Sequence, residues 1–284
     1  MGIKKITDVM IGNSKVRIAS EMYNSSDELV RELNNRHTIH DGYEVTNAKI
    51  AKKSDFYGVS SYNEAMELMR LGYQPTVDKL KISLKTSPQM GESKRVKFEN
   101  NIYGFAPIVP LAMMGNPNSM INATIKPMKY KVIDVYYDIS VHYGISTNKV
   151  VQAGQTLLST VLDLERQGYK FNLYAVQGFA GMSSKRIDVL CIKIKSSDRP
   201  FDIKRMSFPL THPAMFRVVG FDWQGKSPIT EYNGPGRGMT ISDKFQKRAE
   251  ELFRGSFGKN AVYIPCARMI GKTGDALKNM LIQK

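Results

Sequence analysis

Cysteine is scarce in this sequence: the 284 residues contain two, Cys191 and Cys266. Two cysteines exclude a disulfide framework and an all-cysteine zinc site, and both lie in apolar, strand-like runs. Long hydrophobic runs are also missing, since no apolar stretch approaches the roughly 18–20 residues that a membrane helix needs. No apolar segment follows the basic first residues, so we expect no secretory signal. We therefore predict a protein of a reducing compartment without a membrane partner.

Acidic residues are the third deficit. The chain has 26 Asp and Glu against 41 Lys and Arg, which gives a formal net charge of +15 at pH 7. Apolar residues make up 42% and charged residues 24%, the balance of a folded protein rather than of a disordered tail. The length suits one large domain or two small ones. The surplus of cations is the strongest functional indication here, because basic surfaces attract phosphates.

The second half of the chain has the regular pattern of an α/β fold. Residues 131–137 and 169–176 predict two strands, and the apolar spacing of 148–167 predicts a helix of about five turns between them. This order favours a parallel pair with a right-handed crossover. Residues 186–195 predict an edge strand with its basic side chains outward. The remaining predicted elements are a helix over 243–253, a strand over 260–267 and a helix over 273–283.

The first half is expected to hold shorter elements in polar surroundings. Residues 24–27 predict the start of one helix, and residues 61–64 form the capping box of another that ends at Gly72. Residues 78–97 alternate basic and apolar side chains, which predicts a hairpin or a loop. Residues 104–120 are rich in Pro, Gly and Met and predict an irregular apolar connector packed against the second half.

We therefore divide the chain into a smaller, basic α+β region at 1–127 and an α/β domain at 128–284. The domain resembles a von Willebrand factor A-type domain in its order of strand, long helix, parallel strand, antiparallel strand and returning helices. The resemblance is closest over residues 132–140, the helix 150–164 and residues 168–174. It implies a mostly parallel sheet with flanking helices.

A metal motif of the same family has a partial match after the first of these strands. The family often carries Asp-x-Ser-x-Ser, and the matching positions read Asp138-Ile139-Ser140-Val141-His142. His142 replaces the last serine, so the motif is incomplete. The resemblance implies a degenerate magnesium site with Asp138, Ser140 and Asp222 as candidate ligands, because magnesium prefers oxygen ligands. Without a metal, Asp138 and Ser140 would hold the loop through backbone hydrogen bonds.

The whole chain is also similar to a bacteriophage-encoded protein family that lends no function. The similarity implies a phage protein in the host cytoplasm, with a place in the virion as the alternative. Five segments carry it: Ser60–Ala65, Gly104–Pro110, Gly115–Met120, Leu164–Tyr169 and His212–Arg217.

Lysine and arginine gather in several stretches, among them 79–97 and 185–205, and aromatic residues such as Phe98 and Phe201 interleave with them. Basic grooves with aromatic side chains hold single-stranded nucleic acid, and each stacked base contributes about 1–3 kcal/mol. Residues 234–238 add a glycine-rich loop before a helix, which could hold a phosphate oxygen. The predicted phosphate contacts are Lys94, Arg95, Lys97, Lys193, Lys195, Arg199, Arg205 and Arg237.

These patterns leave three hypotheses open. The leading one is a non-enzymatic bacteriophage accessory protein that binds RNA or single-stranded DNA through a basic face. The second is a phage assembly or virion-associated structural protein that self-associates into a homo-oligomer or docks onto phage partners, which its 16 Met and 14 Tyr favour. The third is a metal-dependent module at Asp138, Ser140 and Asp222. No nucleophile–base pattern stands out, so an enzyme is less favoured.

Overall fold

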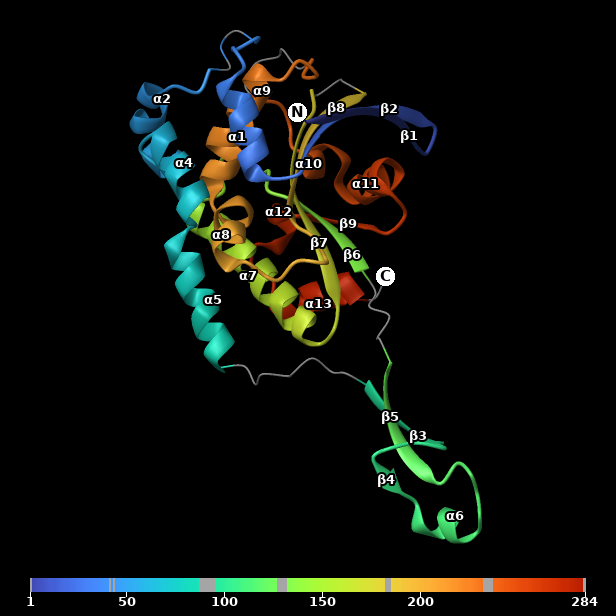
Figure 1. Ribbon diagram of the computed structural model, residues 1–284. Coiled ribbons are helices and arrows are strands. Elements are labelled where there is room, and N and C mark those ends of the chain that lie inside the picture. Colours follow the sequence, from blue (N-terminus) through green and yellow to red (C-terminus); the bar gives the residue numbers. More distant parts are fainter. Residues whose placement is uncertain are drawn as a thin grey trace.

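The computed structural model describes residues 2–40, 42, 44–86, 95–126, 132–181, 185–231 and 237–282. Six strands form its central sheet: β1 (Ile3–Ile11), β2 (Ser14–Tyr23), β6 (Val132–Asp138), β7 (Lys170–Phe179), β8 (Arg186–Lys195) and β9 (Ala261–Pro265). Their order across the sheet is β1-β2-β8-β7-β6-β9 (Figure 1). The pairs β2–β8, β7–β6 and β6–β9 are parallel, and β1–β2 and β8–β7 are antiparallel. The predicted α/β class with a mostly parallel sheet is confirmed.

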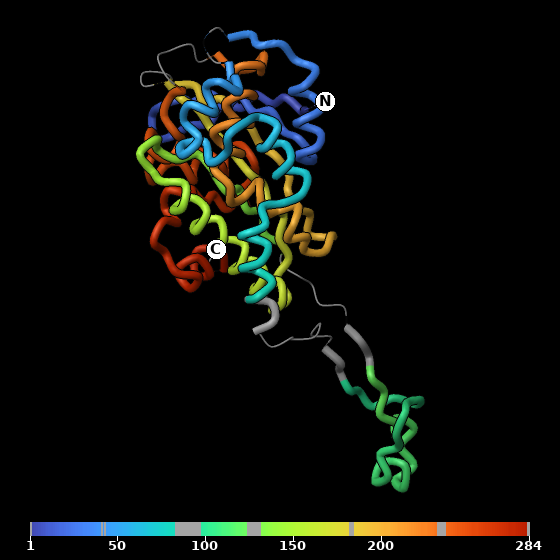
Figure 2. The backbone as a smooth tube through the Cα atoms, turned by 90° about the vertical axis from the view of Figure 1, so that its left-hand side faces the viewer, coloured from blue at the N-terminus to red at the C-terminus, as the bar shows by residue number. Residues whose placement is uncertain are grey.

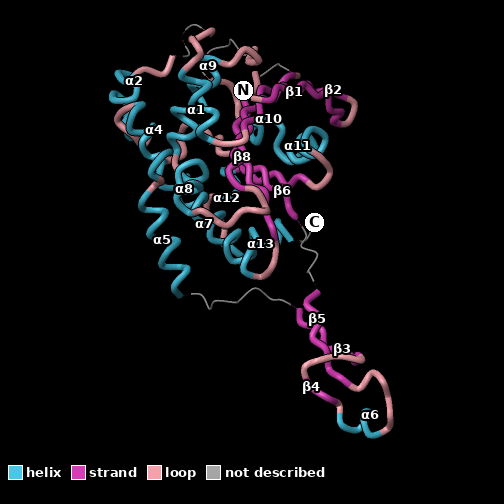
Figure 3. Tube along the Cα trace, viewed as in Figure 1, coloured by secondary structure: helices cyan, strands magenta, loops and turns pink. Residues whose placement is uncertain are grey.

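Helices cover both faces of this sheet (Figures 1 and 3). The helical segments are α1 (Ser26–Asn34), α2 (Asn47–Lys52), α3 (Ser54–Tyr57), α4 (Tyr62–Leu71), α5 (Gln74–Thr86), α6 (Val109–Met113), α7 (Thr147–Arg166), α8 (Ile203–Thr211), a π-helix (Met215–Gly220), α9 (Phe221–Lys226), α10 (Ile241–Phe245), a 3₁₀ turn (Gln246–Arg248), α11 (Ala249–Phe257), α12 (Cys266–Met269) and α13 (Gly274–Ile282). None of these helices is both long and apolar enough to cross a membrane.

The sheet has a hydrophobic core on each side. On one face α1, α7, α8 and α13 bury their apolar side chains in the larger core. On the other face α10 and α11 pack with β1 and β2 in a smaller core. In β6, Val135 and Tyr137 belong to the larger core and Tyr136 to the smaller one. The central strands are therefore apolar on both faces, as expected for a sheet between two helical layers.

The predicted helix starts in the first half are confirmed. In α1, the Ser25 hydroxyl accepts a hydrogen bond from Glu28 N at 3.2 Å. In α4, Ser61 does the same for Glu64 N at 3.1 Å, and Gly72 ends the helix with a φ of 87°. These side chains satisfy amide groups that a helix leaves unpaired at its start, so each helix start depends on a few adjacent residues.

Other expectations are wrong. Residues 78–86 belong to α5 instead of a hairpin or loop, because Val77 and Leu80 are buried under the neighbouring helices. Strand β8 is not an edge strand, since β2 pairs with it on one side and β7 on the other. Because β1 and β2 complete the main sheet, residues on both sides of the predicted boundary at 127 share one sheet.

A second, three-stranded sheet is built from residues 95–126. Its strands are β3 (Arg95–Asn101), β4 (Ala106–Pro107) and β5 (Met120–Lys126), in the antiparallel order β3-β5-β4. Figure 2 shows it apart from the larger body. We expected an apolar connector packed against the second half, but Met113 and Met114 are 84% and 80% exposed. Phe98, Tyr103 and Phe105 are also exposed.

Candidate functional site

Four of the eight predicted phosphate contacts lie in one cleft at the edge where β2 and β8 end. The cleft has a volume of about 660 Å³. Besides the four predicted cations it contains Arg70, from the last turn of α4. We call it the basic cleft. Its lining residues are Asn24, Ser25, Ser26, Asp27, Met69, Arg70, Lys193, Ile194, Lys195, Ser196, Arg199, Pro200, Asp202, Arg205 and Met206.

The local register of β8 turns its two lysine side chains toward different faces of the sheet. The β7–β8 pairing shifts between Leu173 and Tyr174, so that these two residues oppose Lys195 and Lys193. This irregularity turns the end of the strand, as bulges do. The Lys193 ammonium lies 6.0 Å from the centroid of the Tyr174 ring, whereas Lys195 reaches the Glu165 carboxylate of α7 at 2.6 Å.

Two of the cleft's cations are neutralised within the protein. Lys195 is buried and its charge is matched by Glu165. Arg205 pairs with Asp27 at 3.1 Å, and both of these side chains are 64% exposed. An exposed pair of this kind is worth little, about 0–1 kcal/mol, so it opens readily for another anion.

Three cations of the cleft have no acidic partner. The side chains of Arg70, Lys193 and Arg199 form no ion pair within the described part of the chain. Asp202 also lines the cleft, but its side chain caps α8 by accepting a hydrogen bond from Arg205 N at 3.1 Å. The cleft therefore presents an excess of positive charge to an anionic ligand.

The other predicted phosphate contacts do not join this group. Lys94 lies outside the described residues, and Arg95 and Lys97 lie in β3 with side chains outside the described set. Arg237 and Gly238 are the described residues of the glycine-rich loop; the Arg237 guanidinium stacks 4.6 Å from the Phe221 ring centroid and donates to the Phe221 carbonyl at 3.1 Å. Sequence reasoning missed Arg70, because only the packing of α4 brings it to β8.

The predicted magnesium ligands take part in hydrogen bonds within the protein. Asp138 is fully buried and accepts hydrogen bonds from Ser140 N at 2.9 Å and from the Tyr263 hydroxyl at 2.5 Å. Burial raises the pKa of Asp138 to about 6, against the lowering effect of these hydrogen bonds. Asp222 instead accepts from Tyr62 at 3.1 Å and pairs with Lys226 at 3.0 Å.

This donor set does not fit an octahedral magnesium ion. The ammonium of Lys226 already pairs with the Asp222 carboxylate, and the Ser140 hydroxyl accepts from Gly178 N at 3.4 Å. The described residues contain no group of three or more His, Cys, Asp or Glu side chains able to hold a metal. Magnesium binding stays a prediction, to be tested by calorimetric titration.

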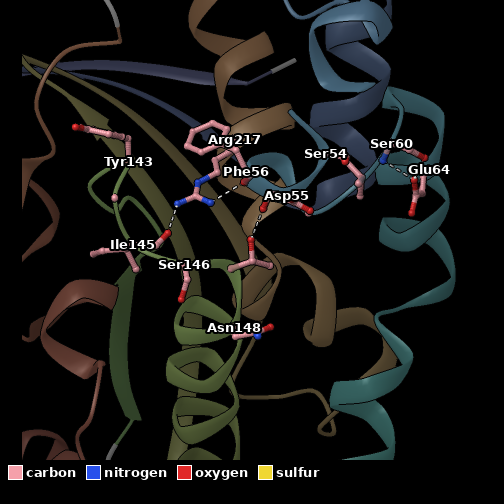
Figure 4. A pocket seen from close by; sticks show the side chains of 14 residues that line it. Ser54, Asp55, Phe56, Ser60, Glu64, Tyr143, Ile145, Ser146, Asn148 and Arg217 are labelled. Atoms are coloured by element: carbon pink, nitrogen blue, oxygen red, sulfur yellow. Dashed lines mark hydrogen bonds between the residues drawn. The ribbon is translucent and has the colours of Figure 1, made fainter. Parts of the chain in front are cut away.

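Two further neighbouring cavities lie beyond the carboxyl ends of β6 and β7, at the opposite end of the strands from the basic cleft. One, of about 760 Å³, contains Arg217 and the first residues of α7 (Figure 4). The other, of about 700 Å³, is lined mainly by aromatic side chains. Phe56 and Tyr143 line both. Sequence reasoning missed these cavities, because Arg217 falls in a segment with no clear periodicity.

Fold and cleft together define a mixed α/β protein with a cation-rich cleft at one edge of its sheet. The chain belongs to the family described as a domain of unknown function (DUF7192), which matches residues 5–281. Neither a curated protein nor a solved structure matches the chain.

Proposed function

We propose that this protein binds single-stranded nucleic acid, RNA or DNA, and that the basic cleft holds the phosphates of the strand. The observation that carries the proposal is that Arg70, Lys193 and Arg199 all line one cleft and form no ion pair with any described residue. Three like charges in one cleft repel one another, and a polyanion relieves this repulsion while releasing its own counterions.

Exposed aromatic side chains support a single strand as the ligand. Phe98 and Tyr103 of the three-stranded sheet are 63% and 64% exposed. Exposed rings of this kind stack on unpaired bases, at about 1–3 kcal/mol per base. Because phosphate contacts carry no sequence information, we expect weak sequence preference at the cleft.

The proposed setting is that of a non-enzymatic bacteriophage accessory protein acting in the host cytoplasm. The support for a phage origin is the similarity of the segments named in the sequence analysis. We also propose that the larger body is a degenerate von Willebrand A-like domain, since β6, α7, β7 and β8 follow the order of that family.

The salt dependence of oligonucleotide binding tests the proposal. Each phosphate neutralised on a single strand contributes roughly 0.7 to the slope of log K against log salt, so the triple variant R70Q/K193Q/R199Q should flatten this slope by about 2. The matched control is K52Q/K247Q/K272Q, which removes the same charge from exposed lysines elsewhere and should change the slope far less. Equal slopes for the two triple variants, or for the cleft variant and the unmodified protein, would refute the proposal.

A second candidate function is assembly through protein–protein contacts. It is favoured by the apolar side chains on residues 95–126, where Phe105, Met113 and Met114 are exposed. Exposed apolar groups of this density mark interaction surfaces. Light scattering before and after nuclease treatment separates the candidates: an oligomer that survives nuclease favours assembly, and one that dissociates favours nucleic-acid binding.

A further inference from the structure

The two cavities at the carboxyl ends of β6 and β7 are candidates for a binding site separate from the basic cleft. The basic cleft lies at the carboxyl end of β8, and β8 runs antiparallel to β7. The carboxyl end of β7 therefore lies at the opposite end of the strands from the basic cleft. In α/β sheets, ligands commonly bind outside the carboxyl ends of the strands. We call the two spaces the Arg217 cavity and the aromatic cavity.

Arg217 is a buried cation that pairs with no acidic side chain in the described part of the chain. It is 1% exposed, and the π-helix that carries it is a rare element often found at functional sites. Its guanidinium donates to the carbonyls of Phe56 at 2.6 Å and Ile145 at 2.8 Å (Figure 4). The guanidinium also lies 4.2 Å from the Phe56 ring centroid. Its Nε has no hydrogen-bond partner among the described residues, and no carboxylate of these residues pairs with it. A buried charge is costly unless it is paired, so this position favours an anionic ligand.

The start of α7 lines the same cavity. Its N-cap residue, Ser146, makes no side-chain hydrogen bond to the helix. The Thr147 hydroxyl donates to the Asp55 carbonyl at 2.8 Å instead of capping the helix. Lys149 N donates to the Ser146 carbonyl at 3.1 Å, but the amide groups of Thr147 and Asn148 form no hydrogen bond with the described residues. At the start of this 20-residue helix they add their partial positive charge to that of Arg217.

Acidic groups at the rim limit how much negative charge the Arg217 cavity accepts. The Glu64 carboxylate already accepts hydrogen bonds from Ser60 N at 2.7 Å and from the Ser60 hydroxyl at 2.5 Å. The Asp55 side chain is exposed to solvent. The cavity thus has one guanidinium and one helix start as positive groups, and two carboxylates at its rim oppose them. This charge balance suits a single anionic group rather than a polyanion.

The aromatic cavity adjoins the Arg217 cavity, since Phe56 and Tyr143 line both. Phe179, Phe216 and Phe221 line it together with the shared Phe56 and Tyr143. Its volume of about 700 Å³ and its mainly apolar lining are those of a small-molecule site.

Two charged groups give the aromatic cavity its polar contacts. The Arg237 guanidinium lies over the Phe221 ring. The Asp243 carboxylate accepts no hydrogen bond from the described residues, so it can receive one from a ligand N–H group.

We propose that the two cavities form one binding site for a small organic anion in which a planar, hydrogen-bonding aromatic ring is joined to a single phosphate, the chemistry of a nucleoside monophosphate. The ring occupies the aromatic cavity, and the phosphate lies between Arg217 and the start of α7. The site goes beyond the proposed function, because it is separate from the basic cleft and takes a free small molecule.

Tryptophan fluorescence of the full chain tests the proposal. Trp223 is the only tryptophan, and its ring stacks on Phe179, at 6.2 Å between centroids, so a ligand against Phe179 should change its emission. The probes are AMP, GMP, CMP and UMP, with the four matching nucleosides and inorganic phosphate as fragments. We expect at least one monophosphate to bind roughly tenfold more tightly than its nucleoside, since a charged hydrogen bond is lost without the phosphate.

Variants assign the contacts. Arg217→Gln should bring the affinity for the monophosphate down to that for the nucleoside. Tyr143→Ala, at a side chain 76% exposed and therefore safe for folding, should weaken both ligands. Met10→Ala, at a side chain of β1 that is 62% exposed and outside the cavities, should change neither. The triple variant of the basic cleft should also leave monophosphate binding intact, which separates this site from the proposed function.

Three outcomes would overturn the proposal. One is the absence of a fluorescence change with all four monophosphates at millimolar concentration, checked by calorimetry. Another is equal affinity of the unmodified protein for nucleoside and monophosphate. The third is unchanged binding in Tyr143→Ala, a result that stands even if Arg217→Gln fails to fold.

Discussion

Replacing Glu21 by glutamine should destabilise the whole fold, because this side chain joins three separate parts of it. Glu21 lies in β2, is fully buried and accepts two hydrogen bonds from Arg36, at 2.6 and 3.1 Å. Trp223 Nε1 donates to it at 2.7 Å and the Ser227 hydroxyl at 2.8 Å. The carboxylate thus links the main sheet to the end of α1 and to α9.

The magnitude follows from what a glutamine side chain at this position could keep. The shape and part of the hydrogen bonding survive, but the negative charge facing Arg36 is lost, and Arg36 keeps only its contact with Glu32 at 2.5 Å. Hydrogen bonds to charged groups are worth about 1.5–3 kcal/mol, and breaking a buried ion pair costs about 3–5 kcal/mol. We expect a loss of about 3 kcal/mol, which lowers Tm by about 5 °C for a chain of this length.

The effect should depend on pH in one direction. Burial alone would raise the pKa of Glu21, but the hydrogen bonds from Arg36, Ser227 and Trp223 outweigh it and hold the pKa below its ordinary 4.5. A lowered carboxyl pKa stabilises the fold above the ordinary value, and this contribution disappears as the pH falls through the lowered pKa. The Tm difference between Glu21→Gln and the unmodified protein should therefore be full at pH 7 and shrink below about pH 4.

Thermal unfolding followed by circular dichroism measures both expectations. The control is Glu250→Gln, because Glu250 pairs with Arg254 on a half-exposed helix face, where we expect a loss of less than about 1 kcal/mol. If Glu21→Gln melts with the unmodified protein at pH 7, or if its deficit is the same at all pH values, the reasoning from this buried network is wrong.

Two further predictions concern the body of the fold. Gly154→Ala should destabilise the fold by about 2 kcal/mol or more, because the added Cβ would lie 2.2 Å from the Leu210 carbonyl oxygen of α8, and this clash outweighs the better helix propensity of Ala. The control Gln152→Ala, on the exposed side of α7, should be nearly neutral. Equal urea midpoints for the two variants would contradict the predicted clash. Asp138→Asn should gain stability relative to the unmodified protein as the pH rises from 4 to 6. Burial raises the pKa of Asp138 from its ordinary 3.8 to about 6, so over this range the unmodified protein loses the stability that its buried neutral carboxyl group contributes, whereas the variant has no group to ionise. A constant difference between the urea midpoints of the two proteins across this range would refute the explanation.

The elements that sequence reasoning predicted correctly are those whose signals are local. Strands β6 and β7 and helix α7 are adjacent in the chain, and each carries its own periodicity and stop residues. Four predicted phosphate contacts are close in sequence and line one cleft: Lys193, Lys195, Arg199 and Arg205. Their contact with phosphate stays a prediction.

What sequence reasoning missed depends on distant contacts. The burial of Val77 and Leu80, which makes α5 a helix, comes from packing on other helices. Arg70 reaches the basic cleft only because α4 packs on α8. Arg217 lies in a π-helix beyond Pro209 and Pro213, where the proline residues obscure any regular period.

The position of β8 between β2 and β7 also governs how the chain reaches its native state. The β1–β2 hairpin comes first in the chain, yet its parallel neighbour begins at Arg186. Such a long sequence separation slows folding, because loop-closure entropy is lost before the contact forms. Until residues 186–195 have been synthesised, the edge of β2 that β8 covers in the native sheet has no partner strand, and an unpaired edge of this kind can pair with other chains.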